Sequence, residues 1–241
     1  MSFRAVLSRR AALLGLTGSL AASHRARADA TPSPLAEGVC RLMPQTVEGP
    51  FYLDPKLVRD DIREDRPGLP LTLRLRVIEA GPCTPVPHAR VDVWHADARG
   101  IYSGYRRQGD TGGLSTEGQT FLRGTQTSDA EGWVAFRTIY PGWYPGRATH
   151  VHFKVFLDAR TLVTGQMYFP EPATAAVYRD AAYGNRAAAR DTLNAQDGIA
   201  RHDDPAGIGL CTLAEDQTGR IASLIVGIDR KGPPKAGWWR F

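Results

Sequence analysis

The segment His150-Val151-His152-Phe153-Lys154-Val155-Phe156-Leu157 alternates between apolar and other side chains, which predicts a β-strand. Successive side chains of a strand point to opposite faces, so every second residue from Val151 to Leu157 lies on one apolar face. His150 and His152 share the other face. One short segment therefore predicts both a sheet core and a pair of imidazoles held side by side on a rigid element.

The same period of two recurs along the chain. Apolar residues occupy every second position from Leu71 to Val77, and Thr or Arg fills the positions between them. Further strands are predicted at 90–94, 121–127, 133–138, 163–169 and 221–228, with turn signals such as Pro141-Gly142 between them. Only 173–183 and 187–193 favour helix. Many short strands and little helix predict an all-β fold, an antiparallel β-sandwich with long loops.

Composition narrows the class of partners. The chain has 241 residues, of which 42% are hydrophobic, and no run of residues reaches the ~18 to 20 apolar positions that a membrane span needs. Residues 1–30 hold five of its 30 basic side chains and one of its 25 acids, which leaves 25 basic and 24 acidic groups beyond them. Nearly all of the excess positive charge therefore lies in residues 1–30, so nucleic-acid binding is excluded as a leading hypothesis.

Residues 1–30 are typical of an export signal, with basic residues, an apolar run and the small-x-small site Ala28-Asp29-Ala30. Arg9-Arg10 is similar to the twin-arginine signal, although Ala12 stands where Phe is usual, so the general secretory route stays open. We expect a periplasmic or extracellular protein.

Residues 31–70, rich in Pro, Gly and charge, are predicted to form an extended arm, and 71–241 the catalytic sandwich. Cys40, Cys83 and Cys211 allow one disulfide, but their pairing cannot be deduced from the sequence, and all three could be buried thiols.

The histidine pair could bind one metal ion, although two strand histidines are more often polar side chains of a solvated face. Two tyrosines change this balance. Tyr144 lies in the Pro- and Gly-rich loop that leads into His150, and Tyr102 follows the predicted strand at 90–94. Loops held by a sheet are where functional residues concentrate.

Several motifs occur in order between residues 45 and 169: Glu48-Gly49-Pro50-Phe51-Tyr52, Trp94-His95-Ala96-Asp97-Ala98 through Tyr102, Phe121-Leu122-Arg123-Gly124, the run 136–155, and Gly165-Gln166-Met167-Tyr168-Phe169. In this order they resemble the intradiol ring-cleavage dioxygenases, non-haem ferric enzymes of the catechol and protocatechuate types. The resemblance covers most of the chain from about Gln45 to Phe169.

The resemblance implies a role for each matching residue. It implies Tyr102, Tyr144, His150 and His152 as the ligands of Fe(III). It also implies Arg147, Tyr144 and Gln166 as catalytic residues, and Gly49, Pro50, Tyr102 and Arg147 as substrate-binding residues. Val47 stands where the family usually has Thr and His95 where Gln is common, so we expect differences in pocket shape and substrate choice.

The implied ligands are chemically consistent with ferric iron. Two phenolates and a hydroxide would balance three positive charges, and hard anionic oxygens favour the ferric state. Zinc sites normally use His, Cys, Asp or Glu. The resemblance implies that a catechol-class diol and O2 are the substrates and that the ring opens between the two hydroxylated carbons to a muconate-type diacid.

Two alternatives stay open: a non-catalytic β-sandwich binding module, and a zinc hydrolase that uses the histidine pair. A homo-oligomer is possible, and the sequence leaves its interface and the particular catechol derivative undetermined.

Overall fold

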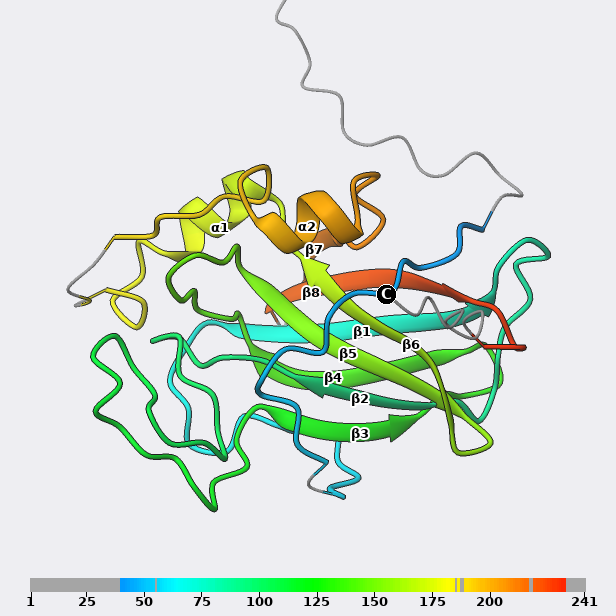
Figure 1. Ribbon diagram of the computed structural model, residues 1–241, viewed down its shortest axis with the longest axis horizontal. Coiled ribbons are helices and arrows are strands. Elements are labelled where there is room, and N and C mark those ends of the chain that lie inside the picture. Colours follow the sequence, from blue (N-terminus) through cyan, green and yellow to red (C-terminus); the bar gives the residue numbers. More distant parts are fainter. Residues whose placement is uncertain (1–39, 55, 185, 187–188, 217–218, 233–241) are drawn as a thin grey trace, which may run out of the picture. The chain divides into compact units, whose positions relative to one another are not determined.

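The computed structural model describes residues 40–54, 56–184, 186, 189–216 and 219–232 (Figure 1). The predicted export signal and the start of the arm lie outside these residues. In chain order the elements are β1 (Pro70–Glu79), β2 (Arg90–Trp94), β3 (Arg123–Thr127), β4 (Trp133–Ile139), β5 (His150–Leu157), β6 (Arg160–Tyr168), α1 (Glu171–Val177), α2 (Gly198–Asp203), β7 (Thr212–Asp216) and β8 (Gly219–Ile228).

The strands form two four-stranded sheets, ordered β4-β1-β8-β7 and β3-β2-β5-β6 (Figure 1). The all-β fold with little helix is therefore confirmed. All pairs are antiparallel except β1 and β8, which pair in parallel from Leu71↔Arg220 to Glu79↔Ile228. Parallel neighbours need a long connection, and here the whole second sheet and both helices lie between the two strands in the chain. Local alternation gives no sign of this pairing.

The apolar faces predicted from the period of two form the core. Leu73, Leu75 and Val77 of β1 are fully buried, as are Val151 and Phe153 of β5. Each such side chain stabilises the fold by about 1.5–3 kcal/mol relative to an exposed position. The strand alternation thus decides which residues form the core between the sheets.

The described part of the arm, residues 40–54 and 56–69, runs along both sheets. The amides of Met43 and Ile62 donate to Gly227 of β8 and Arg137 of β4. The amide of Thr46 donates to Thr164 of β6, and that of Arg59 to Thr125 of β3. The arm therefore covers strands of both sheets, although it contains no long strand of its own.

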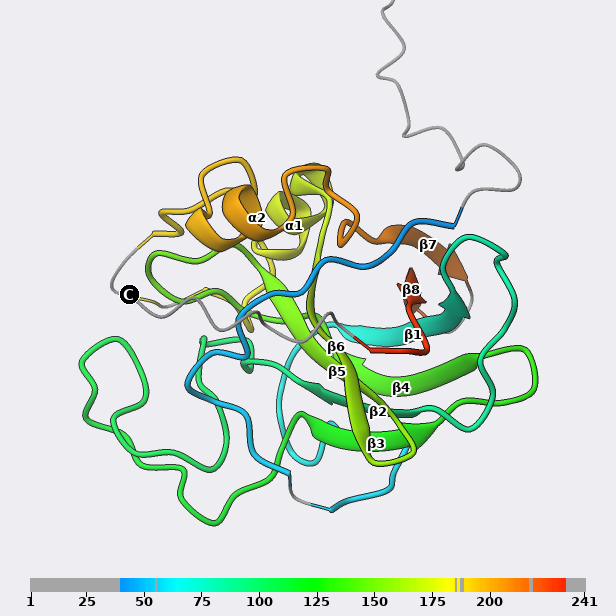
Figure 2. The same cartoon turned by 45° about the vertical axis from the view of Figure 1, so that its right-hand side comes forward.

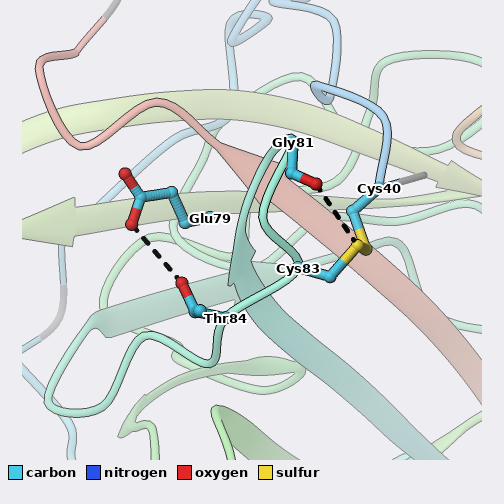
Figure 3. Close-up of a disulfide and its surroundings, with 5 residues drawn as sticks. All are labelled: Cys40, Glu79, Gly81, Cys83 and Thr84. Atoms are coloured by element: carbon cyan, nitrogen blue, oxygen red, sulfur yellow. Dashed lines mark hydrogen bonds between the residues drawn. A yellow bond between two sulfur atoms is a disulfide. The ribbon is translucent and has the colours of Figure 1, made fainter. Parts of the chain in front are cut away.

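A disulfide joins Cys40 to Cys83 and ties the arm to the connection after β1 (Figure 3). Their Cα atoms are 5.2 Å apart, within the usual range for a disulfide. Cys211 is a buried free thiol. The structure thus selects one of the pairings that the sequence left open.

The helical predictions were only partly correct. α1 is shorter than the predicted 173–183 and starts earlier, at Glu171. Of the predicted helix 187–193, residues 187–188 lie outside the described part, and 189–193 are not helical. α2 and β7 were not predicted from the sequence. Both helices lie beyond the end of the sheet at which β5 begins and β6 ends (Figure 2). Within the described residues, no helix has the length and apolarity to cross a membrane.

Candidate metal centre

β5 places His150 and His152 side by side on the face opposite the core. Both side chains are buried, at 3% and 2% exposure, so the alternative of a solvated histidine face is wrong. The Nδ1 atom of His150 lies 2.7 Å from the carbonyl oxygen of Ala148. Because a carbonyl only accepts, Nδ1 carries the proton and the Nε2 lone pair is free. The Nε2 atoms of the two imidazoles are 3.0 Å apart.

Two tyrosine hydroxyls complete the cluster. The Oη atoms of Tyr102 and Tyr144 lie 3.5 Å and 3.3 Å from Nε2 of His150. Tyr102 is in the loop after β2, and Tyr144 is in the loop between β4 and β5. The structure thus brings together all four residues that the sequence analysis implied as metal ligands.

Glycines allow the two tyrosine-bearing loops to approach each other. A Cβ atom on Gly142 would lie 2.4 Å from the carbonyl oxygen of Asp97, and one on Gly100 would lie 2.2 Å from that of Trp143. Real Cβ atoms essentially never make such short contacts. Only glycine permits this backbone approach, and the amide of Gly142 then donates to Asp97.

Burial makes every group of the cluster electrically neutral when no cation is present. It raises the pKa of Tyr102 well above its usual value and raises that of Tyr144. It lowers the pKa of His150 to about 3 and lowers that of His152 well below its usual value. Neutral imidazoles are the form that binds metals. Buried phenols lose their protons only when a nearby positive charge compensates the phenolate.

The spacing of the four donors fits a metal ion. Metal–nitrogen and metal–oxygen bonds of about 2.0–2.1 Å at angles of 90–120° place donor atoms about 2.8–3.6 Å apart. The three separations around His150 Nε2 fall in this interval. Two phenol oxygens and two imidazole nitrogens could therefore hold a highly charged ion such as Fe(III).

The zinc-hydrolase alternative lacks its ligands. Across the described residues, no three His, Cys, Asp or Glu side chains are grouped so that they could hold a metal ion. Zinc sites normally draw at least three ligands from these types. The donor set here depends on its tyrosines.

Aromatic rings and the arm enclose the cluster. Phe51 stacks on Tyr102 with ring centroids 4.5 Å apart, and Trp94 stacks on His152 at 4.9 Å. Gly49, at a positive φ of 73°, lies over His152, where a Cβ atom would be 3.5 Å from the imidazole. Pro50, predicted beside it, is exposed. The structure thus places Gly49 at the cluster and Pro50 at its rim.

Two cavities lie near this region. One of about 190 Å³ is lined by Phe51, Gly100, Arg107, Gln108, Gly109, Asp110, Tyr144 and Pro145. A cavity of about 150 Å³ can hold a benzene ring in other proteins, so this one has room for a single substituted aromatic ring. A larger cavity of about 250 Å³ borders Tyr168 and α2, and none of the four donor residues lines it.

Arg147 is held in place by a polar network that the sequence analysis found only in part. Its Nε donates to Asp197 at 2.8 Å, and its terminal nitrogens donate to Gln166 and, at 3.3 Å, to Tyr144 Oη. Gln166 also accepts from Tyr168 Oη at 2.8 Å and donates to the carbonyl of Val47. Arg147 and Gln166 therefore reach the cluster together, through Tyr144.

Asp197 is the site residue that sequence reasoning missed. It is fully buried, accepts from the amides of Ile199 and Ala200 as the N-cap of α2, and also accepts from the amide of Ala148. These bonds and Arg147 lower its pKa despite the cost of burial. An aspartate just before a short apolar segment is a helix-start signal. Asp197 could therefore have predicted the start of α2 from the sequence. Its contact with Arg147 could not have been found this way.

The two positions at which the chain departs from the family pattern behave differently. His95 is fully buried, with its ring nitrogens 2.8 Å from the Ala96 carbonyl and 2.7 Å from Thr138 Oγ1, and it lines neither of the two cavities. Its effect on substrate choice stays a prediction. His95 joins β4 to the chain after β2. Val47 is half exposed next to Gln166 and Gly49, so it stays a candidate for pocket shape.

Comparison with known protein families shows to which family the chain belongs. The model of the dioxygenase family matches residues 44–204, which is more than half of the chain and contains all four donors. The chain belongs to the intradiol ring-cleavage dioxygenases. The match begins before Gly49 and ends after Asp197, so it also includes the residues around the cluster.

Individual members of the intradiol family show the same relationship. The chain is 30% identical to catechol 1,2-dioxygenase of Acinetobacter baylyi over 83% of this chain and 65% of that protein. It is 37% identical to the protocatechuate 3,4-dioxygenase beta chain of Burkholderia cepacia over 58% of this chain and 62% of that one. The first relatives are longer: the chain spans between about half and two thirds of the catechol 1,2-dioxygenases that it matches.

Among solved structures, an intradiol ring-cleavage dioxygenase of Tetranychus urticae superposes with a TM-score of 0.71 at 28% identity, covering 79% of this chain and 95% of that one. The dioxygenase domain of a carbohydrate-binding fusion protein from Streptomyces sp. SirexAA-E gives a TM-score of 0.57 at 26% identity, covering 78% and 99%. The chain thus corresponds to nearly the whole length of these two solved structures.

Proposed function

We propose that this protein is a non-haem Fe(III) intradiol dioxygenase that opens a catechol-class ring between its two hydroxylated carbons. The observation that carries the proposal is the convergence of two phenol oxygens and the Nε2 atom of His152 at 3.0–3.5 Å from Nε2 of His150. Tyr102, Tyr144, His150 and His152 would hold the iron. When bound, ferric iron would supply a Lewis-acidic centre that takes both oxygens of the diol and makes the ring reactive toward O2.

Tyr144 is the residue to which we assign proton acceptance from the diol. Its Oη is 3.3 Å from a terminal nitrogen of Arg147, whose positive charge favours the phenolate form that accepts a proton. Gln166 and Asp197 hold the same guanidinium from other directions. Arg147 would also stabilise negative charge that develops on the ring.

The surroundings of the cluster favour a flat substrate and exclude water. The rings of Phe51 and Trp94 cover Tyr102 and His152, and Gly49 leaves the space over His152 without a side chain. The adjoining cavity, at about 190 Å³, accommodates a single ring. The relatives named for catechol and protocatechuate support the same substrate class. A non-catalytic binding module would have no use for the four-donor cluster.

The test measures oxygen uptake by the iron-loaded protein with a panel of catechols, and the mass of the product. We expect one O2 consumed per ring and a muconate-type diacid. Loaded protein should show a visible tyrosinate-to-iron absorption band, which Tyr144→Phe or Tyr102→Phe should shift or abolish. Tyr183→Phe is the matched control, because it removes a buried hydroxyl that bonds only Leu69 and Tyr140. Ring cleavage beside the diol, or a protein that takes up no iron, would refute the proposal.

We also propose export, through the twin-arginine route. The leader pattern at 1–30 supports it, as does the Cys40–Cys83 disulfide, because disulfides persist mainly in oxidising compartments. The experiment is cell fractionation with sequencing of the mature N-terminus, comparing the unaltered chain with Arg9→Lys/Arg10→Lys. We expect cleavage after Ala30 and retention of the double variant in the cytoplasm. Export of the double variant at the normal level would indicate the general secretory route.

A further inference from the structure

Arg123, at the start of β3, is a buried cation whose side chain bonds only neutral groups. It is 1% exposed. Its Nε donates to Ser103 Oγ at 2.8 Å, one terminal nitrogen donates to the Ser103 carbonyl at 2.7 Å, and the other donates to the Phe51 carbonyl at 2.7 Å. In the part of the chain that the structure describes, no carboxylate lies within ion-pair distance of this guanidinium.

This arrangement differs from that of Arg147, the other arginine near the cluster. Arg147 has a carboxylate partner in Asp197, at 2.8 Å. Burying a charge without such a partner costs several kcal/mol after relaxation. Three well-formed hydrogen bonds offset part of this cost for Arg123. However, its three acceptors are uncharged, so an uncharged donor side chain could bond them as well. The guanidinium carbon also lies 5.6 Å from the centroid of the Tyr105 ring, which adds a cation–π contact. The reason for an arginine at this position lies in the groups that its planar fork joins.

The positions that Arg123 binds suggest the reason. Ser103 follows Tyr102 in the chain, and the ring of Phe51 stacks on the ring of Tyr102 at 4.5 Å. One guanidinium thus holds both the backbone next to Tyr102 and the residue that covers its ring. Phe51 comes from the arm and Ser103 from the loop after β2, so Arg123 joins these two segments directly beside Tyr102. Tyr105 Oη also joins them, by donating to the Tyr52 carbonyl.

The electrostatic relation between Arg123 and Tyr102 points the same way. Burial lowers the pKa of Arg123 only to about 10, so it stays charged at neutral pH. Its positive charge acts on the Tyr102 phenol in the direction that favours the phenolate. In a site enclosed by aromatic rings, charges are screened less than they are in water.

We propose that Arg123 is a positioning residue for Tyr102: its planar fork holds the backbone next to Tyr102 and the residue that covers its ring, and so fixes the place of the phenol oxygen. The proposal rests on the proposed function, because it assigns Tyr102 as a metal ligand. It predicts that changes at Arg123 alter metal binding through Tyr102 without Arg123 touching the metal.

The experiment compares the unaltered full chain with Arg123→Gln, Arg123→Lys and the control Arg59→Gln. Arg59 also donates to backbone carbonyls next to β3, those of Thr120 and Arg123 itself, but it is paired with Glu64 and contacts neither Ser103 nor Phe51. Three quantities are measured: ferric affinity by competition with a chelator, the position of the tyrosinate-to-iron band at full loading, and thermal unfolding of the metal-free protein.

We expect Arg123→Gln to lower ferric affinity by roughly 10- to 100-fold, the usual effect of losing an indirect partner of a metal ligand, and to shift the band. Arg123→Lys keeps the charge but cannot bond three acceptors in one plane, so its affinity should lie between those of the unaltered protein and Arg123→Gln, again with a shifted band. Arg59→Gln should leave both readouts unchanged, whatever its effect on thermal unfolding.

Each other result overturns the proposal. The proposal fails if Arg123→Gln keeps its ferric affinity within threefold of that of the unaltered protein and its absorption band does not shift. It also fails if Arg59→Gln loses as much ferric affinity as Arg123→Gln. If Arg123→Gln does not fold, Arg123→Lys decides, and a lysine variant that matches the unaltered protein in both readouts refutes the proposal. Failure of the proposed function looks different, because the unaltered protein itself would then bind no ferric iron and show no band.

Discussion

The two sheets meet in one core but differ in what they bury elsewhere. In the described parts of β4, β1, β8 and β7, Thr138 is the only buried polar residue of the strands. The other sheet buries many polar or charged side chains: Asp92, Arg123, Thr125, His150, His152, Thr164 and Gln166. The second sheet therefore has a covered outer face, and that face carries the chemistry.

The arm is the cause of this difference. Tyr52 Oη donates to Asp92 at 2.9 Å, Gly49 lies over His152, and the Val47 carbonyl accepts from Gln166. A single segment thus removes from water the polar side of β2, β5 and β6. Burying polar groups is favourable only when each of them finds a partner, so the outer face becomes a set of connected hydrogen bonds. A substitution that removes an apolar contact in the first sheet should therefore leave this hydrogen-bond network intact.

The largest effect that separates the sheets should come from His150→Ala. We expect turnover to fall by more than about 100-fold, the upper end for losing even an indirect partner of a metal ligand, and iron per chain to fall with it. Oxygen uptake and metal analysis measure the two effects. His202→Ala is the control, because that side chain is 90% exposed. Normal iron content in His150→Ala would contradict the four-donor centre.

Leu73→Ala tests the other sheet. Leu73 is fully buried in β1, so its truncation should cost about 2–5 kcal/mol of unfolding free energy, measured by denaturant titration. Turnover per folded molecule should stay within twofold. Ile225→Ala, on β8 of the same sheet and 40% exposed, should cost clearly less. A fall in turnover of fully folded Leu73→Ala would show that the two sheets are not functionally separable.

Asp197→Asn examines the connection between α2 and the cluster. Asparagine is also a good N-cap, but it removes the charge that holds Arg147, so we expect turnover of the folded enzyme to fall by roughly 10- to 100-fold. Asp191→Asn is the matched control, because Asp191 binds the amide of Gly146 in the same loop without contacting Arg147. Equal losses in the two variants would assign Asp197 to loop stability alone.

The smallest effect concerns His95, which joins the sheets and titrates only in acid. Burial lowers its pKa to about 4, below the ordinary 6.5. Above pH 6.5 neither state is protonated, so His95 contributes no pH dependence there. As the pH falls from 6.5 toward 4, the unfolded chain binds a proton first and the folded state loses stability.

His95→Gln should remove this loss. Between pH 7 and pH 4.5 the unfolding free energy of the variant should fall by roughly 2–3 kcal/mol less than that of the unaltered protein at equal iron content. Denaturant titrations at both pH values measure the difference. His88→Gln, at an exposed position, should follow the unaltered protein. The same acid dependence in His95→Gln would show that His95 is not neutral in the folded state.

Sequence reasoning predicted the strands of the core because each depends on its own alternation of side chains, as in Leu71 to Val77. It missed the parallel pairing of β1 with β8, because nothing local records a partner far away in the chain. The four donors of the proposed metal centre were found through a family resemblance, because spacing alone favoured His150 and His152 as polar side chains of a solvated face. Asp197 and the role of Arg123 were missed for the same reason as the strand pairing, since Arg147 and Asp197 are 50 positions apart.

The sequence by itself determined which side chains of each strand enter the core and which donor types the protein can offer to a metal. Only the tertiary structure decided that Gly100 and Gly142 bring two loops together and that the arm covers β5. It also decided that Arg147 has a carboxylate partner, whereas Arg123 has none among the described residues. Alternation is a property of neighbouring residues. Burial and charge pairing depend on which distant segments pack against each other, and they set the energies from which the chemistry of the cluster follows.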